Sequence, residues 1–359
     1  MDRPRNILIT GAAGYIGGSV LAELLSRTHG PIPGATMHAV VRSGEQLHAL
    51  SKLGANIIQL DLSDGPAVAT VINKNQTVDI IIHTASSIDR VLISNLLQAL
   101  GRRRIIAKTP VYFVHSSVTT WYSEEAGWPF GAIEDTDSIY EKEKRLEIAH
   151  PVREANVLLV EMAKQYGIAS FNLIIPNVYG LGSGEGRKVS ILIPALIQAS
   201  ITAKVVHKFD KDGCPPAAHI SDIADLYRIV LERILLDQAM PNGDDGYYFA
   251  QAHRAPWWAY MKALSRSMEA RGLLEDSELR VWPSDETAAR ALNFPSQFIR
   301  AMGTASGGLQ PINAYRLGWQ PKWDEKMFLN RADEEVQAIL DGNTIRTSIF
   351  EKVMTNPAI

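Results

Sequence analysis

The sequence predicts an α/β protein built on a doubly wound parallel sheet, with a smaller mixed region after it. The first half of the chain alternates short apolar runs with segments of helical period, which is the pattern of successive βαβ units. A glycine-rich turn separates the first apolar run from the first helical segment. Beyond residue 177 the alternation becomes irregular, so we expect the parallel sheet to be encoded mainly by residues 1–180.

The expected strands of the first half are short apolar runs bounded by turn residues, at 7–9, 37–42, 56–60, 78–83, 111–115 and 170–175. The expected helices between them lie at 46–53, 67–73, 91–107 and 152–166. Pro151 and Gly167 mark the two ends of the last helix. Residues 121–150 show no clear period, so we expect an irregular segment there.

The second half predicts helices at 189–199, 221–236, 257–271 and 330–340, with short strands at 205–209 and 247–250. We therefore divide the chain into residues 1–180 and residues 181–359. The second region is expected to bind substrate, with some of its chain returning to the sheet.

Composition excludes several function classes. The chain has 36 basic and 39 acidic residues and a net charge of −3, so no positive field attracts nucleic acid or an anionic membrane. No apolar stretch approaches a membrane-spanning length. Cys214 is the single cysteine, and the first residues, MDRPRN, lack the apolar core of a signal peptide. These features predict a cytoplasmic protein that acts on small molecules.

The glycine-rich turn carries the clearest functional signal. Residues 6–25 read NILITGAAGYIGGSVLAELL, with Gly11, Gly14 and Gly17 between an apolar run and a helical segment. A strand, a glycine turn and a helix in this order place the helix N-terminus where a pyrophosphate can bind. The pattern indicates a Rossmann-type dinucleotide-binding unit in residues 1–180.

The GxxGxxG spacing at the start of the chain resembles the extended short-chain dehydrogenase/reductase superfamily, in its NAD-dependent epimerase/dehydratase-like branch. Further matches are PNVYG at 176–180, HISDIAD at 219–225 and LGWQP at 317–321. The resemblance runs from about residue 6 to residue 340. It implies a nicotinamide cofactor and a small-molecule substrate, and, because family members often dimerise, a homodimer as an alternative to a monomer.

The expected cofactor-binding residues follow strands of the predicted sheet; they are Gly11, Ala13, Gly14, Tyr15, Ile16, Gly17, Arg42, Asp61, Leu62, Thr84, Ala85, Ser86, Pro176, Asn177 and Val178. Arg42 stands where an acidic residue normally binds the ribose of NAD, so it favours the 2′-phosphate of NADP; an ordinary solvated arginine is the alternative. The resemblance places Asp61 at the adenine, although a turn or helix-cap aspartate has the same signature. His83 is expected to be a packed histidine.

The resemblance also implies catalytic residues. A serine or threonine at the end of the fifth strand polarises the reacting carbonyl in this family, and Ser117 matches best, with Thr119 in reserve. The family also needs a Tyr-x-x-x-Lys pair on the next helix. That pattern occurs literally as Tyr140 and Lys144, but Pro151 separates it from the expected helix.

In the alternative register, the helix start HPVREANV resembles a fungal subgroup with a YPVRK-like start. His150 then takes the tyrosine position and Glu154 the lysine position. Imidazole can move a proton near neutral pH, whereas glutamate cannot supply the missing positive charge. Arg153 is a candidate for replacing that charge. We favour His150 and keep Tyr140 with Lys144 as the alternative.

Three functions remain open from the sequence. The first is an NADP(H)-dependent oxidoreductase acting on a carbonyl or hydroxyl of a small, largely apolar secondary metabolite, with NAD less favoured. The second is a repurposed isomerase or cyclase without redox chemistry, and the third is a non-enzymatic nucleotide sensor. Ile175 replaces the usual arginine before the Pro-Asn loop, which argues against a nucleotide-sugar substrate. Aromatic residues at 121, 122, 128, 130, 257 and 258 are expected in the core or, alternatively, around an apolar pocket. No metal-binding spacing is present.

Overall fold

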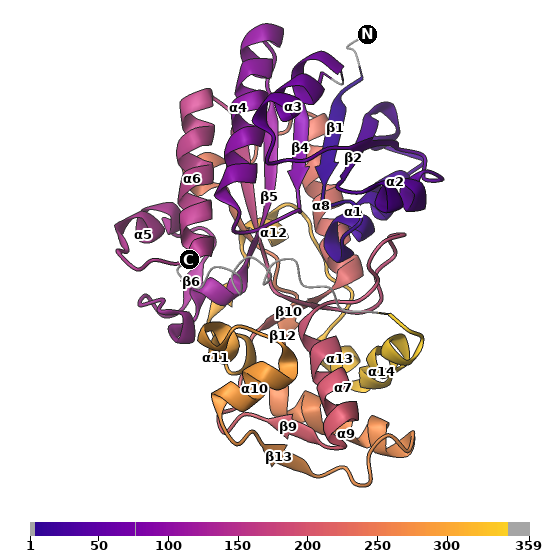
Figure 1. Cartoon of the computed structure of the whole chain (residues 1–359). Coiled ribbons are helices and arrows are strands. Elements are labelled where there is room, and N and C mark those ends of the chain that lie inside the picture. Colours follow the sequence, from indigo (N-terminus) through magenta and orange to yellow (C-terminus); the bar gives the residue numbers. More distant parts are fainter. Residues whose placement is uncertain (1–3, 76, 344–359) are drawn as a thin grey trace.

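The computed structural model of the chain describes residues 4–75 and 77–343. Residues 1–3 of the start discussed above, and residues 344–359 of the expected substrate-binding region, lie outside this range. The described chain forms an upper part around a large sheet and a lower part of helices and short strands (Figure 1).

The large sheet has seven strands within the described residues, and all of its pairings are parallel. In spatial order the strands are β11 (Tyr247–Phe249), β7 (Ala169–Ile175), β5 (Tyr112–Val118), β4 (Ile80–His83), β1 (Asn6–Thr10), β2 (Thr36–Val41) and β3 (Asn56–Gln59). This architecture confirms the predicted α/β fold class. β11 comes from the second half of the chain and pairs with β7 at the edge of the sheet.

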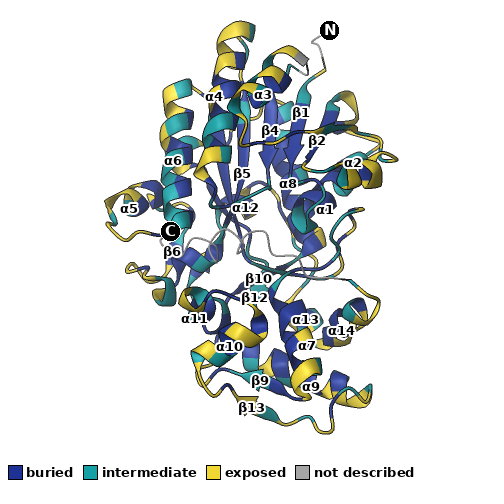
Figure 2. Cartoon of the chain, viewed as in Figure 1, coloured by how far each residue is buried: buried dark blue, intermediate teal, exposed yellow. Residues whose placement is uncertain are grey.

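Helices cover both faces of the sheet, which explains why its strands read as continuous apolar runs. One face carries α1 (Tyr15–Leu25), α2 (Gly44–Leu50) and α8 (Ile220–Leu235). The other carries α3 (Gly65–Thr70), α4 (Arg90–Ala107) and α6 (Pro151–Tyr166). Burial is concentrated in the strands and on the inner faces of these helices (Figure 2).

The lower part has its own apolar core. Its helices are α7 (Leu192–Ala203), α9 (Trp257–Ala270), α10 (Asp285–Leu292), α11 (Ile299–Gly303), α13 (Glu325–Asn330) and α14 (Ala332–Leu340). In one small sheet, β10 (Pro216–His219) lies between β12 (His253–Arg254) and β8 (Asn177–Tyr179). In another, β13 (Leu279–Val281) pairs with β9 (Val206–Lys208). A further pair joins β14 (Leu309–Gln310) to β6 (Ile133–Glu134), and α12 (Asn313–Arg316) packs beside β11.

Several expected elements differ from the structure. The segment 121–150 is not irregular throughout, because α5 (Ile139–Arg145) forms within it and buries Ile139 and Tyr140. The helix expected at 189–199 begins at Leu192. The helix expected at 330–340 is present as α14, which begins at Ala332, and a separate helix that was not expected, α13, ends just before it at Asn330.

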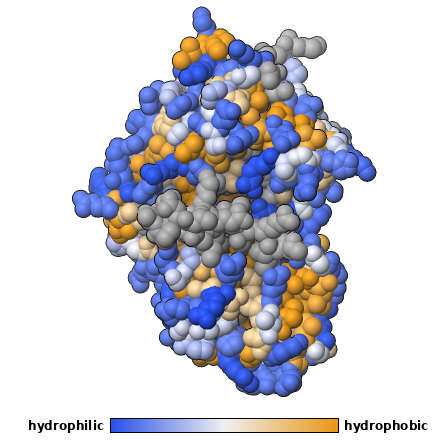
Figure 3. All heavy atoms as spheres, viewed as in Figure 1, coloured by the Kyte–Doolittle hydropathy of each residue, from blue (hydrophilic) through white to orange (hydrophobic). Residues whose placement is uncertain are grey.

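Hydrophilic residues cover most of the outer margin of both parts in the space-filling view (Figure 3). Among the residues that the structure describes, no helix combines the length and the apolar character that crossing a membrane requires.

Candidate active site

A cleft of about 310 Å³ opens at the carboxyl ends of the central strands. The chain order of the strands reverses at β1, which pairs with β2 on one side and β4 on the other. Ligands of open α/β sheets bind outside the strand ends at such a reversal. The cleft is lined there by residues that follow β1, β4, β5 and β7.

The glycine turn forms one end of the cleft. Gly11 has φ +73°, a conformation that side-chain-bearing residues rarely adopt. A Cβ atom on Gly17 would collide with the Thr84 Oγ1 atom and the Gly11 carbonyl. Thr84 itself donates a hydrogen bond to the Thr10 carbonyl over 2.7 Å, which ties β4 to β1. These close approaches hold the N-terminus of α1 against the cleft, where its free backbone N–H groups favour an anion.

A second glycine-rich loop, residues 180–186, packs on this turn. Cβ atoms on Gly184 and Gly186 would collide with Gly18 and with the Ala13 backbone, so both positions require glycine for contact. The backbone N–H of Arg187 donates to the Ala13 carbonyl over 3.1 Å, and Arg187 lines the cleft. Sequence reasoning missed Arg187, because only the folded chain brings this loop to α1.

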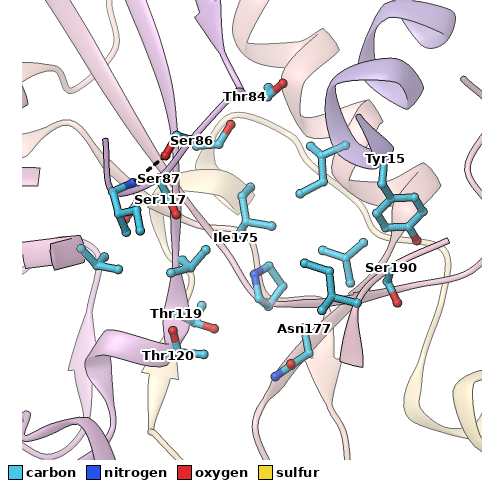
Figure 4. Close-up of a pocket in the computed structure, with 18 of the residues that line it drawn as sticks. Tyr15, Thr84, Ser86, Ser87, Ser117, Thr119, Thr120, Ile175, Asn177 and Ser190 are labelled. Atoms are coloured by element: carbon cyan, nitrogen blue, oxygen red, sulfur yellow. Dashed lines mark hydrogen bonds between the residues drawn. The ribbon is translucent and has the colours of Figure 1, made fainter. Parts of the chain in front are cut away.

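Most of the residues predicted to bind the cofactor meet at this cleft. Those that line it are Gly14, Tyr15, Ile16, Gly17, Thr84, Ala85, Ser86, Pro176, Asn177 and Val178. Gly11 and Ala13 belong to the turn beneath them. Figure 4 shows Tyr15, Thr84, Ser86 and Asn177 around the open space. Arg42, Asp61 and Leu62 do not line the cleft and lie after β2 and β3.

The residues after β2 and β3 have distinct environments. Arg42 is exposed, and its guanidinium makes no hydrogen bond or ion pair within the described chain. Asp61 accepts hydrogen bonds from the backbone N–H and the hydroxyl of Ser63, at 2.9 and 2.7 Å. Asp61 is therefore at least a turn aspartate, and its contact with adenine remains a prediction. Leu62 is buried among the helices of one sheet face.

Two neighbouring serines at the end of β5, Ser116 and Ser117, differ in their hydrogen bonding. The Ser116 hydroxyl forms a short hydrogen bond with the Tyr227 hydroxyl on α8. The Ser117 side chain is buried and lines the cleft, yet its hydroxyl has no hydrogen-bond partner in the described chain. Burying a polar group without a partner costs about 1–3 kcal/mol, so a partner supplied by a ligand is the expected compensation. The predicted reserve residue, Thr119, also lines the cleft.

Two further serines share this condition and were missed from the sequence. Ser87 and Ser190 are buried, line the cleft and have hydroxyls without partners in the described residues. Figure 4 places Ser87 beside Ser117, and Ser190 on the side of Tyr15. Their positions come from a loop after β4 and a loop before α7. No local pattern would have distinguished them from ordinary loop serines.

His150 lies at the entrance to α6, in the N-cap position. Its imidazole contacts the Trp121 ring with centroids 4.4 Å apart and the Phe298 ring at 5.9 Å. It lines the cleft, and its Nδ1 atom has no hydrogen-bond partner in the described chain. Burial, assisted by the charge of Arg153, lowers the pKa of His150 to about 4. The residue is therefore a neutral imidazole at ordinary pH.

The alternative pair lies elsewhere. Tyr140 and Lys144 belong to α5, where the Lys144 ammonium donates to the Tyr140 hydroxyl over 2.9 Å. Lys144 also pairs with Glu161 at 3.1 Å. Neither Tyr140 nor Lys144 lines the cleft, because α5 ends at Arg145 and packs outside α6. The geometry thus favours the His150 register.

Glu154, which the His150 register assigns to the lysine position, does not line the cleft. Its carboxylate forms an ion pair with Arg90 at 2.9 Å. Arg153 does not replace the missing cation, because its guanidinium donates to the backbone carbonyls of Ile148 and Glu143 at 2.8 and 3.0 Å. The cation that does line the cleft is Arg187.

The walls of the cleft are apolar, and the aromatic residues expected in the core do not form them. Trp121, Tyr122, Trp128 and Trp257 are buried core residues, as expected, and the alternative of an aromatic pocket is not met, because none of the aromatic residues at 121, 122, 128, 130, 257 and 258 lines the cleft. The wall comes instead from aliphatic and other apolar side chains, namely Ile88, Val118, Val152, Ile175, Val189, Ile191, Leu192, Phe298 and Met302.

His83 is a packed histidine, as expected. It is fully buried at the end of β4, forms a 2.7 Å hydrogen bond with the Thr10 hydroxyl and stacks on His115. Burial lowers the pKa of His83 to about 4. In the residues that the structure describes, no group of three histidine, cysteine or carboxylate side chains is arranged to hold a metal ion.

The fold and the cleft together define a Rossmann-type α/β protein with a nucleotide-binding turn and an adjoining substrate space. The chain belongs to the NAD dependent epimerase/dehydratase family, whose profile matches residues 7–239. NAD(P) is the cofactor typical of this family. No curated protein matches the sequence.

Solved structures share the whole fold. UDP-glucose 4-epimerase from Bifidobacterium longum, determined with NAD+ and UDP, is 17% identical with a TM-score of 0.64, and the match covers 95% of this chain and 100% of that one. UDP-glucose 4-epimerase from Thermotoga maritima is 18% identical with a TM-score of 0.62, over 93% and 99% of the two chains. Vestitone reductase from alfalfa is 18% identical with a TM-score of 0.60, over 94% and 99%. At these identities the similarity establishes the fold.

Proposed function

We propose that this protein is an NADP(H)-dependent oxidoreductase that acts on a carbonyl or hydroxyl group of a small, largely apolar secondary metabolite. The observation that carries the proposal is one continuous cleft. It begins at the glycine turn of α1 and reaches Ser117 and His150, whose polar atoms have no partners in the described chain, inside an apolar wall.

The residues present fit a nicotinamide dinucleotide. The glycine turn leaves no room for a Cβ atom at Gly17, and the start of α1 lines the cleft. Asn177, Pro176 and Val178 would cover the nicotinamide end. Arg42 supports NADP over NAD, because an exposed guanidinium without a protein partner is available to a 2′-phosphate. When bound, the cofactor would supply or accept a hydride.

The chain's own residues would handle the oxygen and its proton. The Ser117 hydroxyl would donate a hydrogen bond to the substrate oxygen and so stabilise the charge that develops there. His150 would move the proton, and its neutral state suits it to accept one from a substrate hydroxyl. The pairing of Glu154 with Arg90 reduces the repulsion that a free carboxylate would exert on cofactor phosphates. The replacement of tyrosine by His150 and the assignment to a fungal subgroup are parts of this proposal.

The apolar wall supports the substrate class. Ile175 lines the cleft where a nucleotide-sugar enzyme of this family would carry an arginine. Arg187 is near the glycine turn, where it would meet the cofactor's phosphates and not the substrate. An isoprenoid, polyketide or similar metabolite with a few oxygen atoms would match the aliphatic wall and the buried serines.

A non-redox isomerase or cyclase is the second candidate, and one observation favours it. Glu154 pairs with Arg90 and does not line the cleft, and in the His150 register it would stand where the family carries its catalytic lysine. A buried neutral His150 can still remove and return a proton without any hydride transfer.

One assay separates the two candidates. Candidate substrates are supplied with and without NADPH or NADP+, and both the nicotinamide absorbance and the product mass are followed. Oxidoreductase activity predicts one cofactor oxidised or reduced for each product formed. Turnover by cofactor-free protein, at an undiminished rate and without any absorbance change, would refute hydride transfer and support the isomerase or cyclase.

A further inference from the structure

A second cavity of about 270 Å³ lies in the lower part of the molecule, away from Ser117 and His150. Helix α14 forms one wall, and residues of α9, α13 and the loop after β8 form the others. Figure 1 shows α13 and α14 beside α7 at the edge of this part. None of the residues around this cavity takes part in the function proposed above.

One polar group in this cavity lacks a partner. Tyr260 on α9 lines the cavity and is fully buried, and its hydroxyl forms no hydrogen bond within the described chain. Nearby, the Glu335 carboxyl is buried to 7% exposure, and one of its oxygens accepts a hydrogen bond from the Gly180 backbone N–H. A buried carboxyl beside an unpaired phenol is costly unless a bound group satisfies them.

The charges of the lining favour a cation. Glu334, Glu335 and Asp341 line the cavity, against Arg331 and the imidazole of His219. Arg331 pairs with Glu334 at 2.8 Å, so these two charges offset each other and the carboxyls of Glu335 and Asp341 remain. Its guanidinium also lies 4.7 Å from the centre of the Trp323 ring, which shows that the aromatic wall accommodates a positive group.

The aromatic residues supply the apolar part of the wall. Tyr179, Tyr260, Trp323 and Phe328 line the cavity, and the Tyr260 and Phe328 rings stack with centroids 4.2 Å apart. Aromatic walls with a carboxylate at the base are the usual arrangement for recognition of organic ammonium groups. A bare metal ion would find too few oxygen ligands here, since the described residues contain no metal-binding group.

We propose that this cavity is a second ligand site, which binds a small organic cation through its ammonium group. The ammonium donates hydrogen bonds to the Glu335 carboxylate and to the oxygen of the Tyr260 hydroxyl. The alkyl part of the ligand packs against Phe328, beside the stacked ring of Tyr260.

Binding should be tighter at higher pH. Burial raises the pKa of Glu335 to about 7, so the carboxylate that attracts the ligand is fully formed only above that pH. The other titratable or charged groups at the cavity are Tyr179, His219, Tyr260, Arg331, Glu334 and Asp341. Burial lowers the pKa of His219 to about 4, and it raises the pKa values of both tyrosines, so these three stay neutral between pH 6 and pH 8.

The test is calorimetric titration of the full chain with butylammonium chloride at pH 8 and constant ionic strength. 1-Butanol serves as the neutral probe of the same shape. Saturable binding of butylammonium is expected, at least 10-fold tighter than any binding of 1-butanol. Glu335→Gln should weaken butylammonium binding at least 10-fold, while its amide oxygen still accepts from Gly180.

Two further variants sharpen the result. Tyr260→Phe removes a hydroxyl that holds nothing in the fold, and it should weaken binding about 3-fold. Glu325→Gln, at an exposed position of α13 that does not line the cavity, is the matched control and should bind within 2-fold of the natural chain. Thermal unfolding shows that each variant is folded. The proposal is overturned if butylammonium gives no saturable heat, if 1-butanol binds equally well, or if folded Glu335→Gln retains full affinity.

Discussion

The imidazole of His150 packs on the indole ring of Trp121, with ring centroids 4.4 Å apart and an angle of 31° between the rings. Trp121 is fully buried, so it holds the imidazole at the start of α6 in a fixed orientation toward the cleft. The tryptophan does not line the cleft itself. It therefore acts on the site by positioning His150. The ring of Phe298, from the second half of the chain, also contacts the imidazole.

His150→Phe should lower kcat/KM by about 10²–10⁴-fold, the usual contribution of a general acid or base. The phenyl ring keeps the packing on Trp121, so the free energy of unfolding should change little. The measurement is steady-state turnover of the substrate identified by the cofactor assay. Tyr140→Phe is the matched control and should stay within about 3-fold of the natural chain. If only Tyr140→Phe abolishes turnover, the His150 register is wrong.

The pH dependence of kcat/KM should report the environment of His150. Its pKa is lowered to about 4, first by burial and then by the charge of Arg153. The neutral imidazole therefore persists as the pH falls, and base-catalysed turnover should decline only as the pH approaches about 4. An unperturbed histidine would lose activity near 6.5. A profile that falls at 6.5 would contradict buried His150 as the base.

The same shift has a consequence for stability. In the unfolded chain His150 binds a proton at about pH 6.5, whereas in the folded chain it does so only near pH 4. The contribution of neutral His150 to the free energy of unfolding is therefore complete above pH 6.5. It is lost as the pH falls from 6.5 towards 4. Denaturant unfolding of the natural chain and of His150→Phe across this range should show a smaller acid-dependent loss in the variant.

Ser117→Ala should lower turnover and leave stability unchanged, whereas Ser116→Ala should lower stability. Ser117 bonds to nothing in the described chain, so its replacement should leave the midpoint of unfolding unchanged and lower kcat about 10²-fold or more. Ser116→Ala breaks the hydrogen bond to Tyr227 and leaves a buried phenol unpaired, at a cost of about 1–3 kcal/mol. Urea unfolding and turnover of both variants test this pair. A large loss of stability in Ser117→Ala would show that the hydroxyl serves the fold.

Arg42→Ala should weaken the binding of NADPH and leave the binding of NADH nearly unchanged. A charge-assisted contact with the 2′-phosphate is worth about 1.5–3 kcal/mol, so NADPH affinity should fall about 10-fold or more. NADH lacks this phosphate, and its affinity should stay within about 2-fold. Fluorescence titration measures both. Equal affinity of the natural chain for NADH and NADPH would remove the argument for NADP.

Gly17→Ala should abolish dinucleotide binding, because the new Cβ atom would collide with the Thr84 hydroxyl and the Gly11 carbonyl. Relief would require α1 to move away from the strands, which also weakens the fold. Gly44→Ala is the control, since no atom lies within 4 Å of a Cβ atom there. Cofactor titration and thermal unfolding should show both losses in Gly17→Ala alone; cofactor binding by a stable Gly17→Ala variant would contradict the proposed cradle.

Local patterns were sufficient for the sheet and the glycine turn. The runs at β1, β4 and β7 are apolar because helices cover both faces of the sheet. Each of these strands can therefore be predicted from its own residues. Pro151 and Gly167 likewise mark the ends of α6 through their own backbone preferences. The family followed from the same local motifs.

The candidate site could be predicted only in part from the sequence, because it depends on where separate segments meet. Tyr140 and Lys144 match the family's spacing, yet α5 ends before α6 begins and packs outside it. Ser87, Ser190 and Arg187 carry no signal of their own and reach the cleft through two different loops, one after β4 and one between β8 and α7. The sequence alone thus determined a dinucleotide-binding α/β fold, because its signals are local in the chain. Only the tertiary structure decided which polar groups remain without partners at the cleft, because burial and hydrogen bonding depend on contacts between distant residues.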